Sequence, residues 1–310
     1  MKKPGFILLG VACAGIIGGL WYCSHAAAAA QKSFSTAEAA AQALVQAAQN
    51  DDTATLLFLF GPKAKEIVAS GDPVRDKSRR AAFVERARQA MKVQPVPADR
   101  DRAFILVGED EFPFPIPIVK SGGRWRFDTQ EGKHELLARR IGSNELDAID
   151  FCHRFVDAEY QFAAEDHDGS GVRQYAQRFI SSPGKKDGLY WPAPEGSSVS
   201  PIADLVTEAA EEGYDTSGVK PVPYHGYVFR FLTGQGANAQ GGANEYMVHG
   251  LMIGGFGLIA WPVEYGTSGI KTFLVNQSGD VFEKDLGRGT PARVLAITTF
   301  DPDPTWKVVQ

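Results

Sequence analysis

The chain has 310 residues, of which 44% are hydrophobic and 22% are charged, so it carries enough apolar side chains for one or two buried cores. Its formal net charge of −5 argues against a nucleic-acid partner, because phosphate backbones are bound by concentrated basic surfaces. Two of its three cysteines, Cys13 and Cys23, lie near the N-terminus, which leaves Cys152 without a partner for an internal disulfide. These features exclude a small disulfide scaffold and a disordered chain.

Residues 1–30 have the pattern of a signal peptide for export. Lys2 and Lys3 precede an apolar run that ends at Trp21, and small alanines follow it at residues 26–30. The run is shorter than the ~20 residues of a spanning helix and is rich in glycine, which favours cleavage over retention as an anchor. We expect a periplasmic protein, with membrane anchoring through an uncleaved signal, lipid attachment at Cys23 and outer-membrane association as alternatives.

Helical patterns dominate the chain as far as residue 91. A helix capped by Ser35 or Thr36 is expected first, followed by helices over residues 53–60, 63–70 and 77–91. Strand patterns then cover residues 102–109 and 113–129, where Gly122 and Gly123 predict a hairpin turn. A long helix is expected over residues 132–166, with a break at Gly142 and a new cap at Ser143 or Asn144.

The remaining sequence predicts a short helix over residues 200–214 and then strands. The strand patterns lie at residues 224–233, 245–262, 270–279 and 280–286, separated by glycine-rich turns, and predict an antiparallel meander. In "KTFLVN" the alternation places Leu274 on one face and Phe273 and Val275 on the other. The fold class is therefore α+β: a helical and hairpin N-terminal domain (31–142), then a long helix and an antiparallel meander (143–310).

Several segments together resemble a known bacterial family. "GDPVRDKSRR", "ARRIGSNEL", "YAQRFISSPGKKDGLYWP", "YHGYVFRFLTGQG" and "FDPDPTW" resemble the proteins called domain of unknown function 2950. This resemblance implies an exported envelope protein of Gram-negative bacteria without an established activity, so it supplies no catalytic residue. The second domain alone resembles the globular heads of type IV pilin-like and pseudopilin proteins. Because a whole domain separates that head from the apolar N-terminus, the resemblance does not imply assembly into a pilus.

The segment "EDHDGSGVRQY" raises calcium as a candidate cofactor. Asp166, Asp168 and Ser170 alternate as the first ligands of a calcium loop do, and Gly171 occupies the turn position. The twelfth position holds Gln177, where an EF-hand needs a bidentate glutamate. The other interpretation is an Asp/Gly turn that ends the preceding helix.

The loop "KKDGLYWP" contains the candidate ligand-binding residues Lys185, Lys186, Asp187, Tyr190 and Trp191, and His225 is a further candidate outside it. Aromatic rings in an ordered loop often form recognition surfaces, here for glycans or other envelope proteins. The alternative is that Trp191 fills the interface between the two domains.

No set of residues in the sequence predicts a catalytic site. The histidines lack the close spacing of a zinc site, and no serine elbow or phosphate-binding loop occurs. Cys152 lies among apolar residues in a helix, which predicts a buried, inert thiol. We expect a non-enzymatic binding or scaffold protein of the envelope. The alternative is a hydrolase of peptidoglycan or polysaccharide that uses carboxylates near residues 185–191 and His225.

Overall fold

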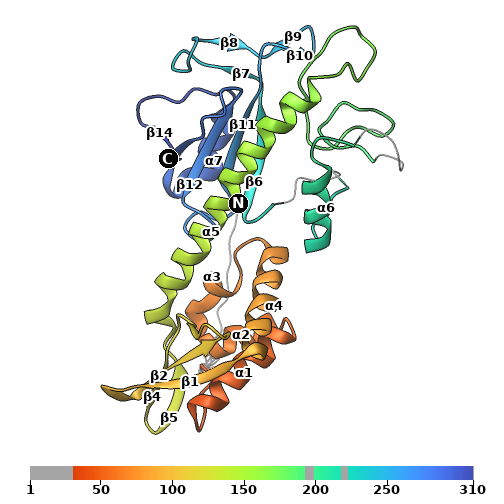
Figure 1. Ribbon diagram of the computed structural model, residues 1–310. Coiled ribbons are helices and arrows are strands. Elements are labelled where there is room, and N and C mark those ends of the chain that lie inside the picture. Colours follow the sequence, from red (N-terminus) through yellow and green to blue (C-terminus); the bar gives the residue numbers. More distant parts are fainter. Residues whose placement is uncertain (1–30, 193–198, 218–222, 310) are drawn as a thin grey trace, which may run out of the picture.

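The computed structural model describes residues 31–192, 199–217 and 223–309 (Figure 1). The predicted signal peptide, residues 1–30, lies outside the described residues. Within them, no helix combines the length and the apolar character that crossing a membrane requires. For description we call residues 31–142 the N-terminal part and residues 143–309 the C-terminal part, after the boundary predicted above, which itself stays a prediction.

The N-terminal part consists of helices packed on an antiparallel sheet. Side chains cap three of the helices: Thr36 accepts the N–H of Ala39, Asp52 that of Thr55, and Asp72 that of Arg75. The sheet has the order β1-β2-β4-β5, and β3 also pairs with β2. The elements are α1 (Ala37–Gln49), α2 (Thr53–Phe60), α3 (Lys65–Val68), α4 (Pro73–Gln89), β1 (Met91–Val96), β2 (Asp99–Val107), β3 (Phe112–Pro113), β4 (Ile118–Ser121) and β5 (Arg124–Phe127).

Helix α5 (Thr129–Phe162) runs through both parts without interruption (Figure 1). The predicted break at Gly142 was wrong. Asn144, one of the two expected caps, points its side chain into the C-terminal part instead, where its Nδ2 donates to the carbonyl of Ser268 at 2.8 Å. The residue therefore serves a tertiary contact, and the helix continues past it.

The C-terminal part contains a five-stranded antiparallel sheet of order β14-β13-β12-β11-β6. The predicted meander is confirmed, although the pattern at residues 245–262 divides into several short strands. Helix α7 and strand β14 were not predicted. The elements are α6 (Ala203–Glu212), β6 (Tyr227–Leu232), β7 (Gly234–Gln235), β8 (Asn244–Glu245), β9 (Met247–Val248), β10 (Leu251–Met252), β11 (Gly257–Pro262), β12 (Lys271–Asn276), β13 (Phe282–Asp285), α7 (Thr290–Ala296) and β14 (Lys307–Val308).

The two faces of this sheet are covered by different helices. Phe273 and Val275 lie in a cluster with Phe155 of α5, whereas Leu274 lies in a second cluster with Val294 of α7. The alternation predicted for β12 is thus confirmed. A third cluster fills the N-terminal part and includes Leu137 of α5, with Ile141 packed against it. Helix α5 therefore contributes to a core at each of its ends.

Candidate functional site

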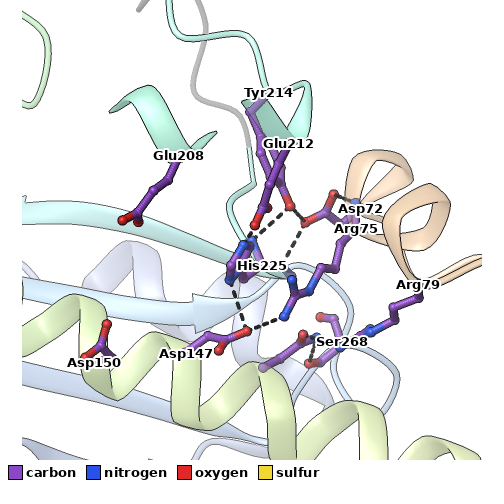
Figure 2. A network of polar contacts seen from close by, with 12 residues as sticks. Asp72, Arg75, Arg79, Asp147, Asp150, Glu208, Glu212, Tyr214, His225 and Ser268 are labelled. Carbon is purple, nitrogen blue, oxygen red and sulfur yellow. Dashed lines mark hydrogen bonds and ion pairs between the residues drawn. The ribbon is translucent and has the colours of Figure 1, made fainter. Parts of the chain in front are cut away.

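A network of polar side chains joins the two parts where α4 begins (Figure 2). Asp72, which is 1% exposed, accepts hydrogen bonds at Oδ2 from the hydroxyl of Tyr214 and from the N–H of Gly226, both at 2.8 Å. Its Oδ1 accepts the N–H of Arg75 at 3.0 Å. One buried carboxylate thus holds α4, the chain after α6 and the turn before β6 together.

His225 lies in the same network, between two carboxylates (Figure 2). Its Nδ1 is 3.0 Å from Oδ2 of Asp147, and its Nε2 is 2.7 Å from Oε2 of Glu212. Arg75 also donates to Oδ2 of Asp147 at 2.6 Å. Burial alone would raise the pKa of Asp147, but the hydrogen bond with His225 and the charge of Arg75 lower it overall. Both ring nitrogens are therefore engaged by carboxylates of the protein.

The backbone of His225 has φ of +49°, in the left-handed region that residues other than glycine rarely adopt. The turn that holds it is closed by two backbone hydrogen bonds between Tyr224 and Tyr227, and the ring of Tyr224 stacks on His225 with centroids 4.0 Å apart. Such conformations persist where the surroundings impose them. The contacts of His225 lie within the C-terminal part, and its partner Asp147 makes the ion pair with Arg75 of the N-terminal part.

The predicted binding loop lines a hollow of about 1080 Å³, which we call the loop hollow. Its walls include every candidate of that loop and two residues of the preceding segment: His167, Asp168, Lys185, Lys186, Asp187, Tyr190 and Trp191. Asp187 is fixed there, because its carboxylate accepts the N–H of Ser182 at 2.7 Å and the hydroxyl of Ser182 at 2.9 Å. Burial raises the pKa of Asp187, but these hydrogen bonds lower it overall.

Trp191 is buried in the core of the C-terminal part. Its ring lies 6.3 Å from that of Phe162 and 5.2 Å from that of His167, and the Nζ of Lys186 stands 5.1 Å from its centroid. The suggestion that Trp191 fills the interface between the parts was wrong, because its aromatic neighbours belong to residues 162–167. It forms the floor of the loop hollow rather than an exposed platform.

A second pocket of about 490 Å³ adjoins the loop hollow, and the two share Ile180 and Thr216 as lining residues. We call it the aromatic pocket. It lies between α5, α6 and β6, and the polar groups of Gln177, Arg178 and Asp215 also line it. Its apolar wall consists of Phe151, Phe179, Leu205, Val206, Tyr224 and Phe229. Sequence reasoning missed this pocket; the aromatic alternation of "YHGYVFRF" was the available signal.

The Asp166 loop has the hydrogen bonding of a turn. Asp166 accepts the N–H groups of Gly169 at 3.0 Å and Gly171 at 2.8 Å, and Asp168 accepts the N–H of Ser170 at 2.9 Å. Hydrogen bonds from Ser170 lower the pKa of Asp168. In the described part of the chain, no three or more His, Cys, Asp or Glu side chains are grouped to hold a metal ion. Calcium binding by Asp166, Asp168 and Ser170 stays a prediction.

Two further ionisable groups lie inside the C-terminal core. Burial raises the pKa of the Cys152 thiol to about 12, so the thiol stays protonated and unreactive. Glu159 is fully buried, and burial raises its pKa well above the ordinary value. Its Oε2 accepts the N–H of Ala176 at 2.8 Å, whereas its Oε1 has no partner among the described residues.

These features define an α+β protein in which a polar junction holds two parts together beside a pair of adjoining pockets. Residues 31–309 match the family described as protein of unknown function (DUF2950), and the chain belongs to that family. No curated protein and no solved structure matches the chain. The resemblance of the C-terminal part to pilin-like heads stays a prediction.

Proposed function

We propose that this protein is exported to the cell envelope and acts there as a non-enzymatic binding protein. The observation that carries the proposal is the aromatic pocket, which adjoins the loop hollow and shares Ile180 and Thr216 with it. Ligand pockets of about 300–1,000 Å³ typically combine an apolar lining with a few convergent polar groups. The aromatic pocket fits that description, and the loop hollow supplies charged groups beside it.

The chemistry of the two pockets favours a glycan of the envelope, such as a peptidoglycan fragment, as the ligand. The faces of sugar rings pack on aromatic side chains such as Phe179 and Tyr224. Carboxylates of the same fragment would meet the cationic groups of Arg178 and Lys185, both of which are exposed. A segment of another envelope protein is the alternative occupant of the same surface.

The contacts of the candidate acid and base groups favour binding over hydrolysis. General acid or base catalysis requires a group within hydrogen-bond reach of the substrate proton. His225 directs both nitrogens to Asp147 and Glu212, and Asp187 directs both carboxylate oxygens to Ser182. These residues were the best candidates for the hydrolase alternative, and each already has protein partners.

The test is a calorimetric titration of the purified protein with soluble peptidoglycan fragments. We expect saturable binding that Val206→Arg abolishes, because Val206 lines the aromatic pocket and the longer cationic side chain would occupy it. Thr207→Arg is the matched control: it adds the same side chain at the next position of α6, where the residue is exposed, and should bind as the native protein does.

Absence of glycan binding, or equal binding by the two variants, would refute this site. Release of cleaved fragments during the titration, detected by chromatography, would establish the hydrolase alternative instead.

A further inference from the structure

A cavity of about 370 Å³ opens to solvent at the edge of the core of the N-terminal part. It lies between α1, α2, α3, α4 and the stretch of α5 from Leu136 to Ser143, and β3 contributes to one wall. Its lining is mainly apolar and includes Leu44, Leu56, Phe60, Ile67, Phe114 and Leu136. We call it the arginine cavity for the side chains described next.

Four guanidinium groups also line this cavity, together with a single carboxylate, that of Asp76. Two of the arginines are neutralised elsewhere: Arg80 pairs with Asp51, and Arg139 with Glu135, both at 2.6 Å. Among the ion pairs of the described residues, none includes Arg79 or Arg140. The cavity therefore has an excess of positive charge.

Arg79 and Arg140 are also incompletely hydrogen-bonded. Arg140 donates to the carbonyls of Glu66 and Ile67, both at 2.5 Å, and leaves its buried Nε without a partner among the described residues. Arg79 donates through one nitrogen to Asn144 at 2.8 Å, and its buried Nη1 likewise has no partner there. Burial and the nearby charge of Arg75 lower the pKa of Arg79 to about 10. The charge of Asp76 acts on both arginines, followed by that of Asp147 on Arg79 and that of Glu264 on Arg140, but none of these carboxylates forms an ion pair with them. Asp76 is the single carboxylate in the lining for two buried cations, and buried cations are costly to leave unpaired, which makes an anion the expected complement.

A hydrophobic side chain lies where the cavity meets the solvent. Phe112 lines it and is 44% exposed, and the guanidinium of Arg139 lies 4.6 Å from the centroid of its ring. An exposed aromatic ring held beside a cationic group suits the entry of a molecule that has both an apolar and an anionic end.

We propose that the arginine cavity binds an anionic amphiphile, with an apolar chain among the core side chains and a carboxylate beside Arg79. This site is separate from the aromatic pocket and shares no lining residue with it. The two proposals can therefore fail independently: Val206→Arg, which blocks the aromatic pocket, should leave amphiphile binding unchanged.

The experiment is a calorimetric titration of the purified protein with sodium decanoate below its micellar concentration. Decyltrimethylammonium, which has the same chain and the opposite charge, is the comparison ligand. We expect saturable binding of decanoate with an affinity at least about tenfold above that of the cation, the factor that one charge-assisted hydrogen bond supplies. Equal binding of the two amphiphiles, or no saturable binding of decanoate, would overturn the proposal.

Two pairs of variants locate the site. Leu136→Trp fills the cavity and should abolish decanoate binding, whereas Ala138→Trp places the same ring at an exposed position of α5 and should not. Arg79→Met should weaken decanoate binding at least about tenfold. Arg88→Met, at an exposed position of the same helix, should leave it unchanged. Because Arg79 also contacts Asn144, circular dichroism melts would verify folding. Native-like affinity in folded Leu136→Trp would place the amphiphile elsewhere and refute the assignment.

Discussion

The buried carboxyl of Glu159 makes the stability of the protein depend on pH in a defined direction. Its pKa is raised well above the ordinary value by burial, and the hydrogen bond from Ala176 opposes that rise only in part. Unfolded glutamate has a pKa of about 4.3, so above that pH the native state binds a proton that the unfolded state has lost. The free energy of unfolding therefore falls as pH rises towards the folded pKa, by about 1.4 kcal/mol for each pH unit.

Glu159→Gln removes this proton and keeps the shape of the side chain and an acceptor for Ala176. We expect the variant to gain stability relative to the native protein by about 1.4 kcal/mol per pH unit between about pH 5 and pH 7, as long as the pH is below the folded pKa. Urea unfolding followed by circular dichroism across this range measures the difference. The control is Glu165→Gln, which makes the same substitution at an exposed position just beyond α5. A stability difference that does not change with pH would refute the reasoning.

Two further predictions concern the polar junction and the Asp166 loop. Asp72→Ala should lower the free energy of unfolding by roughly 3 kcal/mol or more. The substitution removes a helix cap and leaves the buried hydroxyl of Tyr214 and the N–H of Gly226 without an acceptor. Denaturant unfolding would measure this loss, and a value below about 1 kcal/mol would contradict the prediction. Titration with calcium decides between the two interpretations of the Asp166 loop: an unchanged melting temperature would leave the Asp/Gly turn that the hydrogen bonds of Asp166 and Asp168 describe. A rise that the double alanine variant of these residues abolishes would instead establish a calcium site.

Features set by neighbouring residues were predictable from the sequence. The cap at Thr36 and the alternation in β12 depend on positions a few residues apart, so the pattern alone indicates them. Strand β1 was missed because its residues are exposed or half-buried throughout and include Pro95, which leaves neither an apolar run nor a clean alternation. The antiparallel pairing with β2 holds these residues in a strand that their own sequence does not indicate.

The break expected at Gly142 shows a limit of local signals. Glycine lowers helix propensity by about 1 kcal/mol, and asparagine two residues later is a good cap. Tertiary contacts outweigh both, since Asn144 accepts a hydrogen bond from Arg79 of α4 and donates one to Ser268. Neither partner can be inferred from the residues around position 142.

The candidate site was predictable only where its residues are contiguous. The loop from Lys185 to Trp191 was predicted from its sequence and lines one hollow. The aromatic pocket, by contrast, combines Phe151 with Phe229, which come from α5 and β6. The carboxylates beside His225 likewise belong to two different helices. Only the folded chain brings such residues together.

The continuity of α5 has a consequence for folding during synthesis. The first turns of this 34-residue helix pack against residues that precede it, so the N-terminal core can form as soon as they emerge. The apolar face that follows, with Phe155 and Phe162, packs on side chains of β6, β11 and β12, which are made much later. In a newly synthesised chain, the apolar face of α5 therefore lacks its packing partners until these strands have been made. Exposed apolar surface of this kind favours aggregation. Binding of a chaperone to this surface would protect the chain until residue 276 has been added.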